Sequence, residues 1–155
     1  PTCRKGNPGH SEDPAMALGS IPRPGIDEER IHALVHGFYG AVRADDLIGP
    51  VFLGRIQPER WPVHLDKMCA FWSSVLLRTS RYDGRPLRPH LLMPELSDAH
   101  FQRWLALFRA TARQVFEPDT APVVIGFAER IAQSFRMSIA FHRGEDAAGL
   151  KSLPA

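Results

Sequence analysis

Apolar residues recur every three or four positions across residues 27–143, the spacing of one buried face of an α-helix. No stretch in this range alternates between apolar and polar residues for long enough to predict a β-strand. The pattern therefore predicts an all-α fold. A core of 117 residues is the size of one globular domain, so we expect a single folded unit.

The two ends of the chain differ from this core in composition. Nine of residues 1–26 are proline or glycine, against 17 of the other 129 residues. A segment of this composition buries too little apolar surface to order itself, which predicts a disordered extension over residues 1–26. Residues 144–155 are small and polar without an apolar period, and we expect a flexible C-terminal tail there.

Four long helices account for the periodic part of the core. The first is expected from Asp27, an N-cap residue followed by two glutamates, to about Asp45. The second spans residues 59–77, with a proline in its first turn. The third begins after Ser97 and carries its apolar stripe to Val115, and the fourth spans residues 120–142. We expect these helices to form two antiparallel pairs.

Two segments between the helices lack a helical period. Gly49-Pro50 lies in the short segment 47–52, and this dipeptide predicts a turn that reorients the chain. Residues 78–94 contain three prolines and Asp83-Gly84, which predicts an irregular loop. A loop of this length inside a small domain is uncommon unless it is functional or surrounds a ligand.

Charge and cysteine content exclude several classes of protein. The chain has 19 basic and 17 acidic residues, so its net charge of +2 gives no field suited to non-specific nucleic-acid binding. Two cysteines are too few for a disulfide framework or a zinc knuckle, which favours a reducing, cytoplasmic location. No apolar run approaches the length of a membrane-spanning helix, so no membrane association is expected.

His90 is the first candidate functional residue, because it lies in the irregular loop among leucines and prolines. A histidine in such a setting is neutral and shielded from water, as a metal ligand must be, although on spacing alone a partly buried loop histidine bonded to backbone is the commoner case. Four arginines lie nearby within 11 residues. They either clamp the carboxylates of an anionic ligand or form a solvated basic loop; they are Arg78, Arg81, Arg85 and Arg88.

Tyr39, His64 and Trp104 are expected on the inward faces of three different helices. Each of them alone is usually a core polar group that has found a partner. Together they would leave too many polar groups in one dry core unless they share a ligand.

The order and spacing of these residues resemble a truncated haemoglobin of the third group. The resemblance covers residues 28–141, and it rests on an ordered set of short motifs rather than on one signature. These motifs are Phe38-Tyr39, Gly49-Pro50-Val51-Phe52, Trp61 with His64, Phe71-Trp72, Tyr82-Asp83-Gly84-Arg85-Pro86, His90 and His100-Phe101-Gln102-Arg103-Trp104-Leu105.

The resemblance implies a two-over-two helical sandwich around one b-type haem. By position, His90 matches the proximal iron ligand, and His100 is the less favoured rival. Tyr39 and Trp104 match the distal hydrogen-bonding pair, and His64 matches a distal histidine that gates the pocket or ligates the iron. The apolar walls of the haem pocket would be Phe52, Phe71, Trp72 and Leu76, and the haem propionates would contact Arg81, Arg85 and Arg88.

Three functions are consistent with these residues. The first is reversible binding of oxygen or another diatomic gas, such as NO or CO. The second is an enzyme that uses the same haem, either a nitric oxide dioxygenase or a peroxidase. The sequence has no glycine-rich flavin or nicotinamide motif, so an enzyme would need an external reductase as partner. The third is a haem-free helical interaction module.

Overall fold

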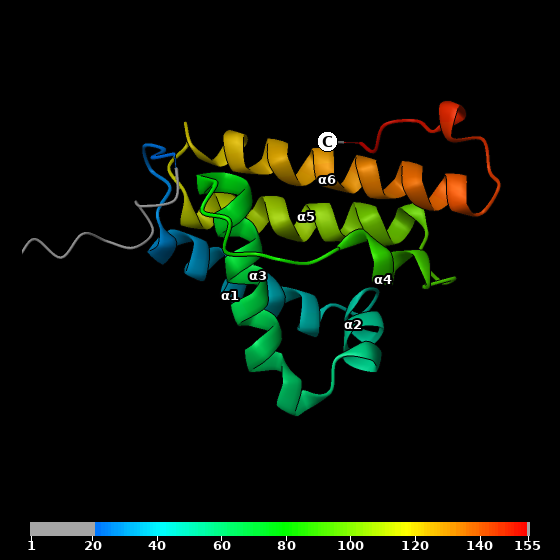
Figure 1. Ribbon diagram of the computed structural model, residues 1–155, viewed down its shortest axis with the longest axis horizontal. Coiled ribbons are helices and arrows are strands. Elements are labelled where there is room, and N and C mark those ends of the chain that lie inside the picture. Colours follow the sequence, from blue (N-terminus) through cyan, green and yellow to red (C-terminus); the bar gives the residue numbers. More distant parts are fainter. Residues whose placement is uncertain (1–20, 155) are drawn as a thin grey trace, which may run out of the picture.

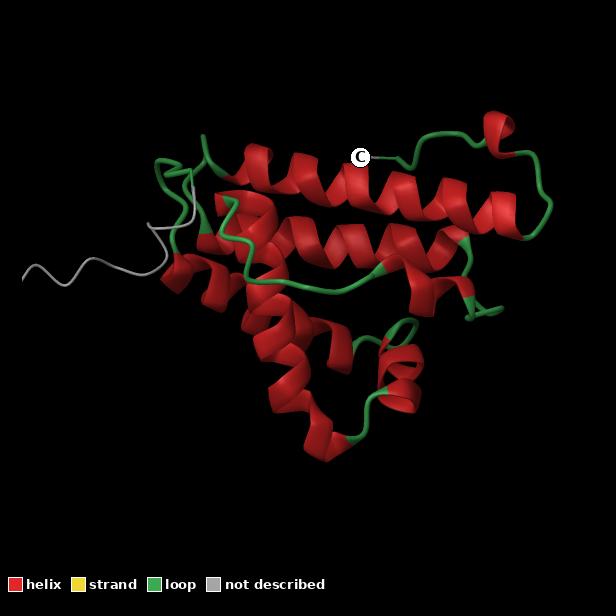
Figure 2. Ribbon diagram, viewed as in Figure 1, coloured by secondary structure: helices red, strands yellow, loops and turns green. Residues whose placement is uncertain are grey.

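The computed structural model describes residues 21–154, and α-helices dominate this part of the chain (Figure 1, Figure 2). The described residues contain no β-strand, and their β-type pairing is a single bridge between Arg23 and Ile26. The α-helices are α1 (Glu28–Ala44), α2 (Gly49–Arg55), α3 (Trp61–Leu77), α4 (Leu87–Leu91), α5 (Asp98–Val115) and α6 (Ala121–His142). Two short 3₁₀ helices accompany them, η2 (Pro58–Arg60) and η3 (Ala147–Gly149).

Helices α5 and α6 lie side by side and run in opposite directions (Figure 1). These two helices form one layer, and α1 and α3 form the other. Helix α1 packs against both α3 and α5, so it joins the two layers. The short helix α4 lies against α6, and α2 contacts α1. The prediction of an all-α fold with four long helices in a two-over-two sandwich is confirmed.

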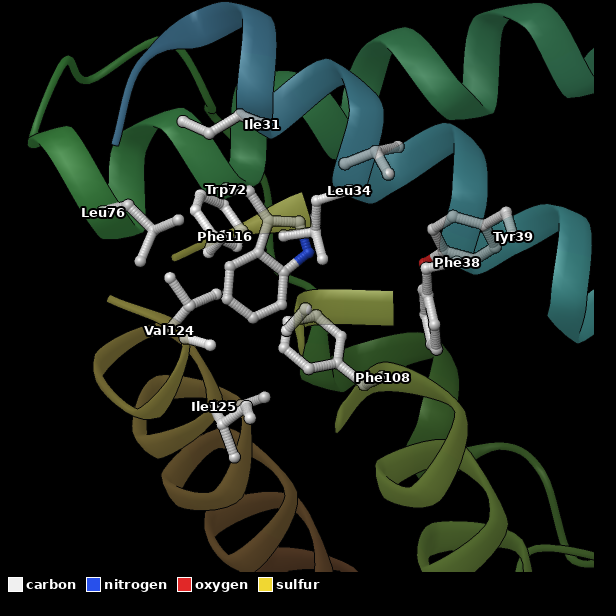
Figure 3. Packing of buried hydrophobic residues seen from close by; sticks show 14 of the residues in the cluster. Ile31, Leu34, Phe38, Tyr39, Trp72, Leu76, Phe108, Phe116, Val124 and Ile125 are labelled. Carbon is white, nitrogen blue, oxygen red and sulfur yellow. The ribbon is translucent and has the colours of Figure 1, made fainter. Parts of the chain in front are cut away.

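The hydrophobic core lies where α1, α3, α5 and α6 meet. Phe108 of α5 is fully buried, and its ring contacts Phe38 of α1 and Trp72 of α3 at centroid distances of 5.3 and 4.9 Å. Figure 3 shows these aromatic rings beside aliphatic side chains from α1 and α6. Aromatic rings from three helices therefore fix how the two layers pack.

The long helices begin and end close to the expected residues because local capping groups set their ends. The Asp27 carboxylate accepts a hydrogen bond from the Arg30 backbone N–H at 2.8 Å, and α1 ends before Asp45. At the start of α5, the Ser97 backbone N–H donates to Nδ1 of His100 at 3.2 Å. Each capping group lies within a few residues of the backbone that it satisfies, so the sequence predicts it well.

Helix α2 corrects the prediction of a simple turn over residues 47–52. Gly49-Pro50 begins a helix instead of stopping one, because proline in the first turn gives up an N–H that has no partner within the helix. The Asp45 carboxylate accepts hydrogen bonds from the N–H groups of Leu47 and Ile48, both at 2.9 Å, and so directs the chain into α2. A Cβ atom at Gly49 would lie 3.0 Å from the carbonyl oxygen of Val42, which explains the glycine.

Helix α4 corrects the prediction of an irregular loop over residues 78–94. This one-turn helix carries His90 and begins directly after Pro86. It is too short to show a helical period in the sequence, and Pro89 within it is a residue that normally argues against a helix. The preceding segment contains Arg78 and Ser80 in left-handed conformations, with φ of 54° and 57°.

The two ends of the described chain lie against the helices. Residues 21–26 belong to the predicted extension, but the Ile21 N–H donates to the Leu77 carbonyl at 2.8 Å and Ile26 is buried. The rest of the predicted extension, residues 1–20, lies outside the described residues. In the C-terminal tail, Leu153 packs against the core and the Pro154 carbonyl accepts a hydrogen bond from Arg109 at 3.4 Å. Between residues 21 and 154, no helix is both long and apolar enough to cross a bilayer.

Candidate functional site

A largely apolar cavity of about 540 Å³ lies between the two helical layers. Its walls come from every α-helix of the described chain and from the segments that flank α4. This volume is in the range of cavities that enclose a small-molecule or cofactor ligand. Its lining includes four of the polar side chains predicted to form the site, namely Tyr39, His64, His90 and Trp104.

His90 enters the cavity from α4 in an orientation that suits a metal ligand. Its Nδ1 atom lies 2.6 Å from the carbonyl oxygen of Pro86, and a carbonyl can only accept, so Nδ1 carries the proton. The lone pair of the neutral ring is therefore on Nε2. Burial lowers the pKa of His90 more than this hydrogen bond raises it, so the ring is neutral at pH 7. Phe135 of α6 packs beside the imidazole at a centroid distance of 4.9 Å.

Tyr39, His64 and Trp104 line the same cavity from α1, α3 and α5. The Tyr39 and His64 rings meet edge to face at a centroid distance of 5.2 Å. Trp104 stacks on Phe108 and is held edge to face by Phe38. Burial raises the pKa of Tyr39, so its hydroxyl keeps its proton and can donate at any physiological pH.

His64 has a buried nitrogen that is without a hydrogen-bond partner. Among the described residues, two buried side-chain nitrogen atoms are in this state, Nε2 of His64 and Nε1 of Trp61. Burial and the positive charge of Lys67 lower the pKa of His64, which keeps the imidazole neutral. An unpartnered polar atom in a buried site is costly, and in His64 it belongs to a residue that lines a cavity. This arrangement points to a ligand in the cavity.

The apolar residues expected around the cavity divide into two groups. Phe52, Phe71 and Trp72 line it, as their positions in the sequence predict. Leu76 does not, because it lies one turn further along α3 and is fully buried in the core. The lining also includes Tyr82 and Phe135, which lie far apart in the sequence. No local pattern connects such residues, so only the fold brings them together.

Basic side chains also line the cavity, although they are not all the expected ones. Arg85 lines it, whereas Arg88 is exposed outside it and Arg81 forms an ion pair with Glu28 at 2.7 Å. The other basic lining residues are Arg55, Lys67 and His100. Lys67 lies one helical turn after His64, and this spacing puts both side chains on the same face of α3. Nothing near Arg55 in the sequence indicates that it lines the cavity.

The residues present fit a haem. A buried, flat, anionic iron cofactor requires a cavity of this volume with aromatic walls, an iron ligand and nearby positive charge. His90 offers a neutral imidazole with its lone pair on Nε2, His64 has a nitrogen without a partner, and several basic side chains line the cavity. His100, the rival ligand, already uses its Nδ1 atom in the helix cap with Ser97. A helical sandwich with such a cavity is the architecture of a globin.

Comparison with known proteins gives the family within the globins. The chain is 34% identical over 113 residues to the group 3 truncated hemoglobin ctb of Campylobacter jejuni, which covers 72% of this chain and 89% of that protein. It also resembles the crystal structure of a group III truncated hemoglobin from Campylobacter jejuni, with a TM-score of 0.71 and 32% identity over 77% of this chain and 95% of the other. No protein-family model matches the chain. The chain belongs to the group 3 truncated haemoglobins.

Proposed function

We propose that this protein binds a b-type haem in the cavity through Nε2 of His90 and reversibly binds oxygen or another diatomic gas. When bound, the haem supplies an iron atom with one open coordination position for such a ligand. Membership of a haemoglobin family supports the cofactor. The observation that carries the proposal is the hydrogen bond from Nδ1 of His90 to the Pro86 carbonyl, which leaves the lone pair of this cavity-lining residue on Nε2.

The chain contributes three polar groups to the ligand side of the proposed pocket. The Tyr39 hydroxyl and the Trp104 indole N–H are donors, and His64 offers a neutral imidazole that either donates or accepts. A diatomic ligand that gains negative charge on binding is retained by such donors. A hydrogen bond to a charged group contributes about 1.5–3 kcal/mol, so each donor slows ligand release by about ten- to a hundredfold.

The basic lining residues provide sites for the two carboxylates of the cofactor. Arg85 and Lys67 place positive charge along the wall of an otherwise apolar cavity, and Arg55, which also lines it, is paired with Glu95. Positive charge at that position stabilises a bound dicarboxylate and limits how it is oriented. Arg81 and Arg88 lie outside the cavity lining, so we do not propose that they contact the carboxylates of the cofactor.

The first test is a change of His90 to alanine. Purified wild-type protein is expected to be red with an intense Soret band, and the His90→Ala variant to lose this band or bind haem much more weakly. His142→Ala is the matched control, because His142 is exposed on α6 and lies outside the cavity lining. A colourless wild-type protein, or an unchanged Soret band in His90→Ala, would contradict the proposal.

The second test measures ligand release from the ferrous protein by stopped-flow spectroscopy. Tyr39→Phe and Trp104→Phe are each expected to release oxygen about ten- to a hundredfold faster than the wild type. His142→Ala serves again as the control, since His142 is exposed at the end of α6 and lies outside the cavity lining. If neither Tyr39→Phe nor Trp104→Phe changes the release rate, the proposed role of these donors is wrong.

A further inference from the structure

Helix α4 carries the proposed iron ligand but cannot hold its own position. It has five residues, and isolated helices in water need about 12–15 residues to be even marginally stable. Prolines precede it, lie within it and follow it, which removes backbone N–H donors that would otherwise tie the segment to its neighbours. The hydrogen bond to the Pro86 carbonyl orients the His90 ring within α4, but the position of α4 itself must be set by tertiary contacts to the segment around it.

Arg143 makes the densest set of such contacts. It is the C-cap residue of α6, and its guanidinium reaches the backbone that directly follows α4. Its Nη1 donates to the Leu96 carbonyl at 2.9 Å, and its Nη2 donates to the carbonyls of Met93 and Pro94 at 3.0 and 3.3 Å. One side chain thus binds three carbonyl groups within four residues.

The contact is connected directly to His90. The Met93 N–H donates to the His90 carbonyl at 3.2 Å, so the same peptide segment is bound by Arg143 on one side and by the histidine backbone on the other. Met93 and Leu96, whose carbonyls Arg143 holds, also line the cavity. A displacement of this segment would therefore move both the cavity wall and the histidine.

We propose that Arg143 is a positioning residue for His90: its guanidinium clamps residues 93–96 to the end of α6 and so fixes α4 and the direction of the His90 imidazole. This inference rests on the proposed function, in which His90 ligates the haem iron. It adds a determinant of the iron–histidine bond that lies outside the cavity lining.

The geometry requires an arginine. A guanidinium presents five N–H donors in a rigid planar fork, so it can satisfy several carbonyls at fixed angles. A lysine ammonium at the same place has three donors on a flexible stem and would retain only part of the clamp. An ion pair between Arg55 and Glu95 at 2.5 Å also holds this segment from α2, but it acts through one exposed carboxylate and not through the backbone.

The test compares haem-loaded wild type with Arg143→Ala, Arg143→Lys and the control Arg113→Ala. Arg113 is an exposed arginine of α5 that lies outside the cavity lining. Two properties are measured, the iron–histidine stretching band in the resonance Raman spectrum of the ferrous protein and the rate of haem transfer to an excess of a haem-scavenging protein. Neither measurement depends on ligand binding or turnover.

Arg143→Ala is expected to shift or broaden the iron–histidine band and to lose haem about tenfold faster, with Arg143→Lys between it and the wild type and Arg113→Ala unchanged. In haem-free protein, amide exchange is expected to rise in residues 87–96 and to stay unchanged in α5. An Arg143→Ala variant with the wild-type band and the wild-type rate of haem loss would overturn the inference alone. A wild-type protein that takes up no haem would overturn the proposed function and this inference together.

Discussion

Replacing Asp98 with alanine should destabilise the protein more than replacing its ion-pair partner Arg136 with methionine. The two side chains form a bidentate pair between α5 and α6, with Nε–Oδ1 and Nη2–Oδ2 distances of 2.9 and 2.8 Å. The partners differ strongly in burial, because the Arg136 side chain is 2% exposed and the Asp98 side chain is 58% exposed. The cost of breaking the pair should therefore depend on which partner is removed.

The magnitudes follow from what each variant leaves behind. Asp98→Ala leaves a buried guanidinium whose remaining partner is Gln133, and breaking a buried pair in this way costs about 3–5 kcal/mol. Since water reaches the Asp98 side of the pair, we expect about 2–4 kcal/mol. Arg136→Met leaves Asp98 in water and fills the buried space with apolar atoms, at a cost of about 0–1 kcal/mol.

The assay is urea-induced unfolding of all variants in the same haem-loaded state, because a bound ligand stabilises the folded protein. Asp98 also lies in the first turn of α5, where a carboxylate contributes up to about 1 kcal/mol through the helix dipole. Glu29→Ala is the control for that contribution, since Glu29 is an exposed carboxylate in the first turn of α1. Equal losses for Asp98→Ala and Arg136→Met, or a larger loss for Arg136→Met, would refute the reasoning.

The same pair predicts a pH dependence. The hydrogen bond from Arg136 holds the pKa of Asp98 below its ordinary value in the folded state. A carboxyl with a lowered folded pKa contributes stability above its unfolded pKa and loses it as the pH falls through the folded pKa. The difference in stability between wild type and Asp98→Ala should therefore be constant from about pH 5 to pH 8 and shrink below about pH 4.

Four further substitutions test the packing and the helix ends. Phe108→Ala removes a fully buried ring and should lower the free energy of unfolding by about 3–5 kcal/mol in urea titrations, and a loss below 1 kcal/mol would contradict the proposed core. Gly49→Ala should cost about 1–2 kcal/mol in thermal unfolding, because the new Cβ would lie 3.0 Å from a carbonyl of α1. Gly40→Ala, where no atom lies within 4 Å of the new Cβ, should instead be neutral or stabilising, and equal effects at both sites would refute the argument. Asp27→Ala removes the N-cap of α1 and should cost about 1 kcal/mol, measured as a lower unfolding midpoint; an unchanged midpoint would show that the cap contributes nothing.

The sequence predicted the long helices well, because both their apolar faces and their ends are local signals. Asp27, Ser97 and the proline at the start of α3 act on backbone groups within one turn of themselves. The polar residues of the site were also found from the sequence, since Tyr39, His64 and Trp104 occupy inward positions of helices with clear periods. His90 was a candidate because of its apolar, proline-rich surroundings, and the family resemblance gave it the role of iron ligand.

The tertiary structure decided what depends on contacts between distant segments. Helices α2 and α4 are too short to show a period, and the segment that follows α4 is bound by Arg143, which lies 47 residues after Leu96 and 50 after Met93. The basic lining shows the same limit, because Arg55 faces the cavity while Arg81 is drawn away by Glu28, 53 residues earlier. The sequence by itself therefore determined which helices form and which faces they bury. Only the fold decided which charges reach the cavity and how the histidine-bearing turn is held, because these depend on partners that are remote in the chain.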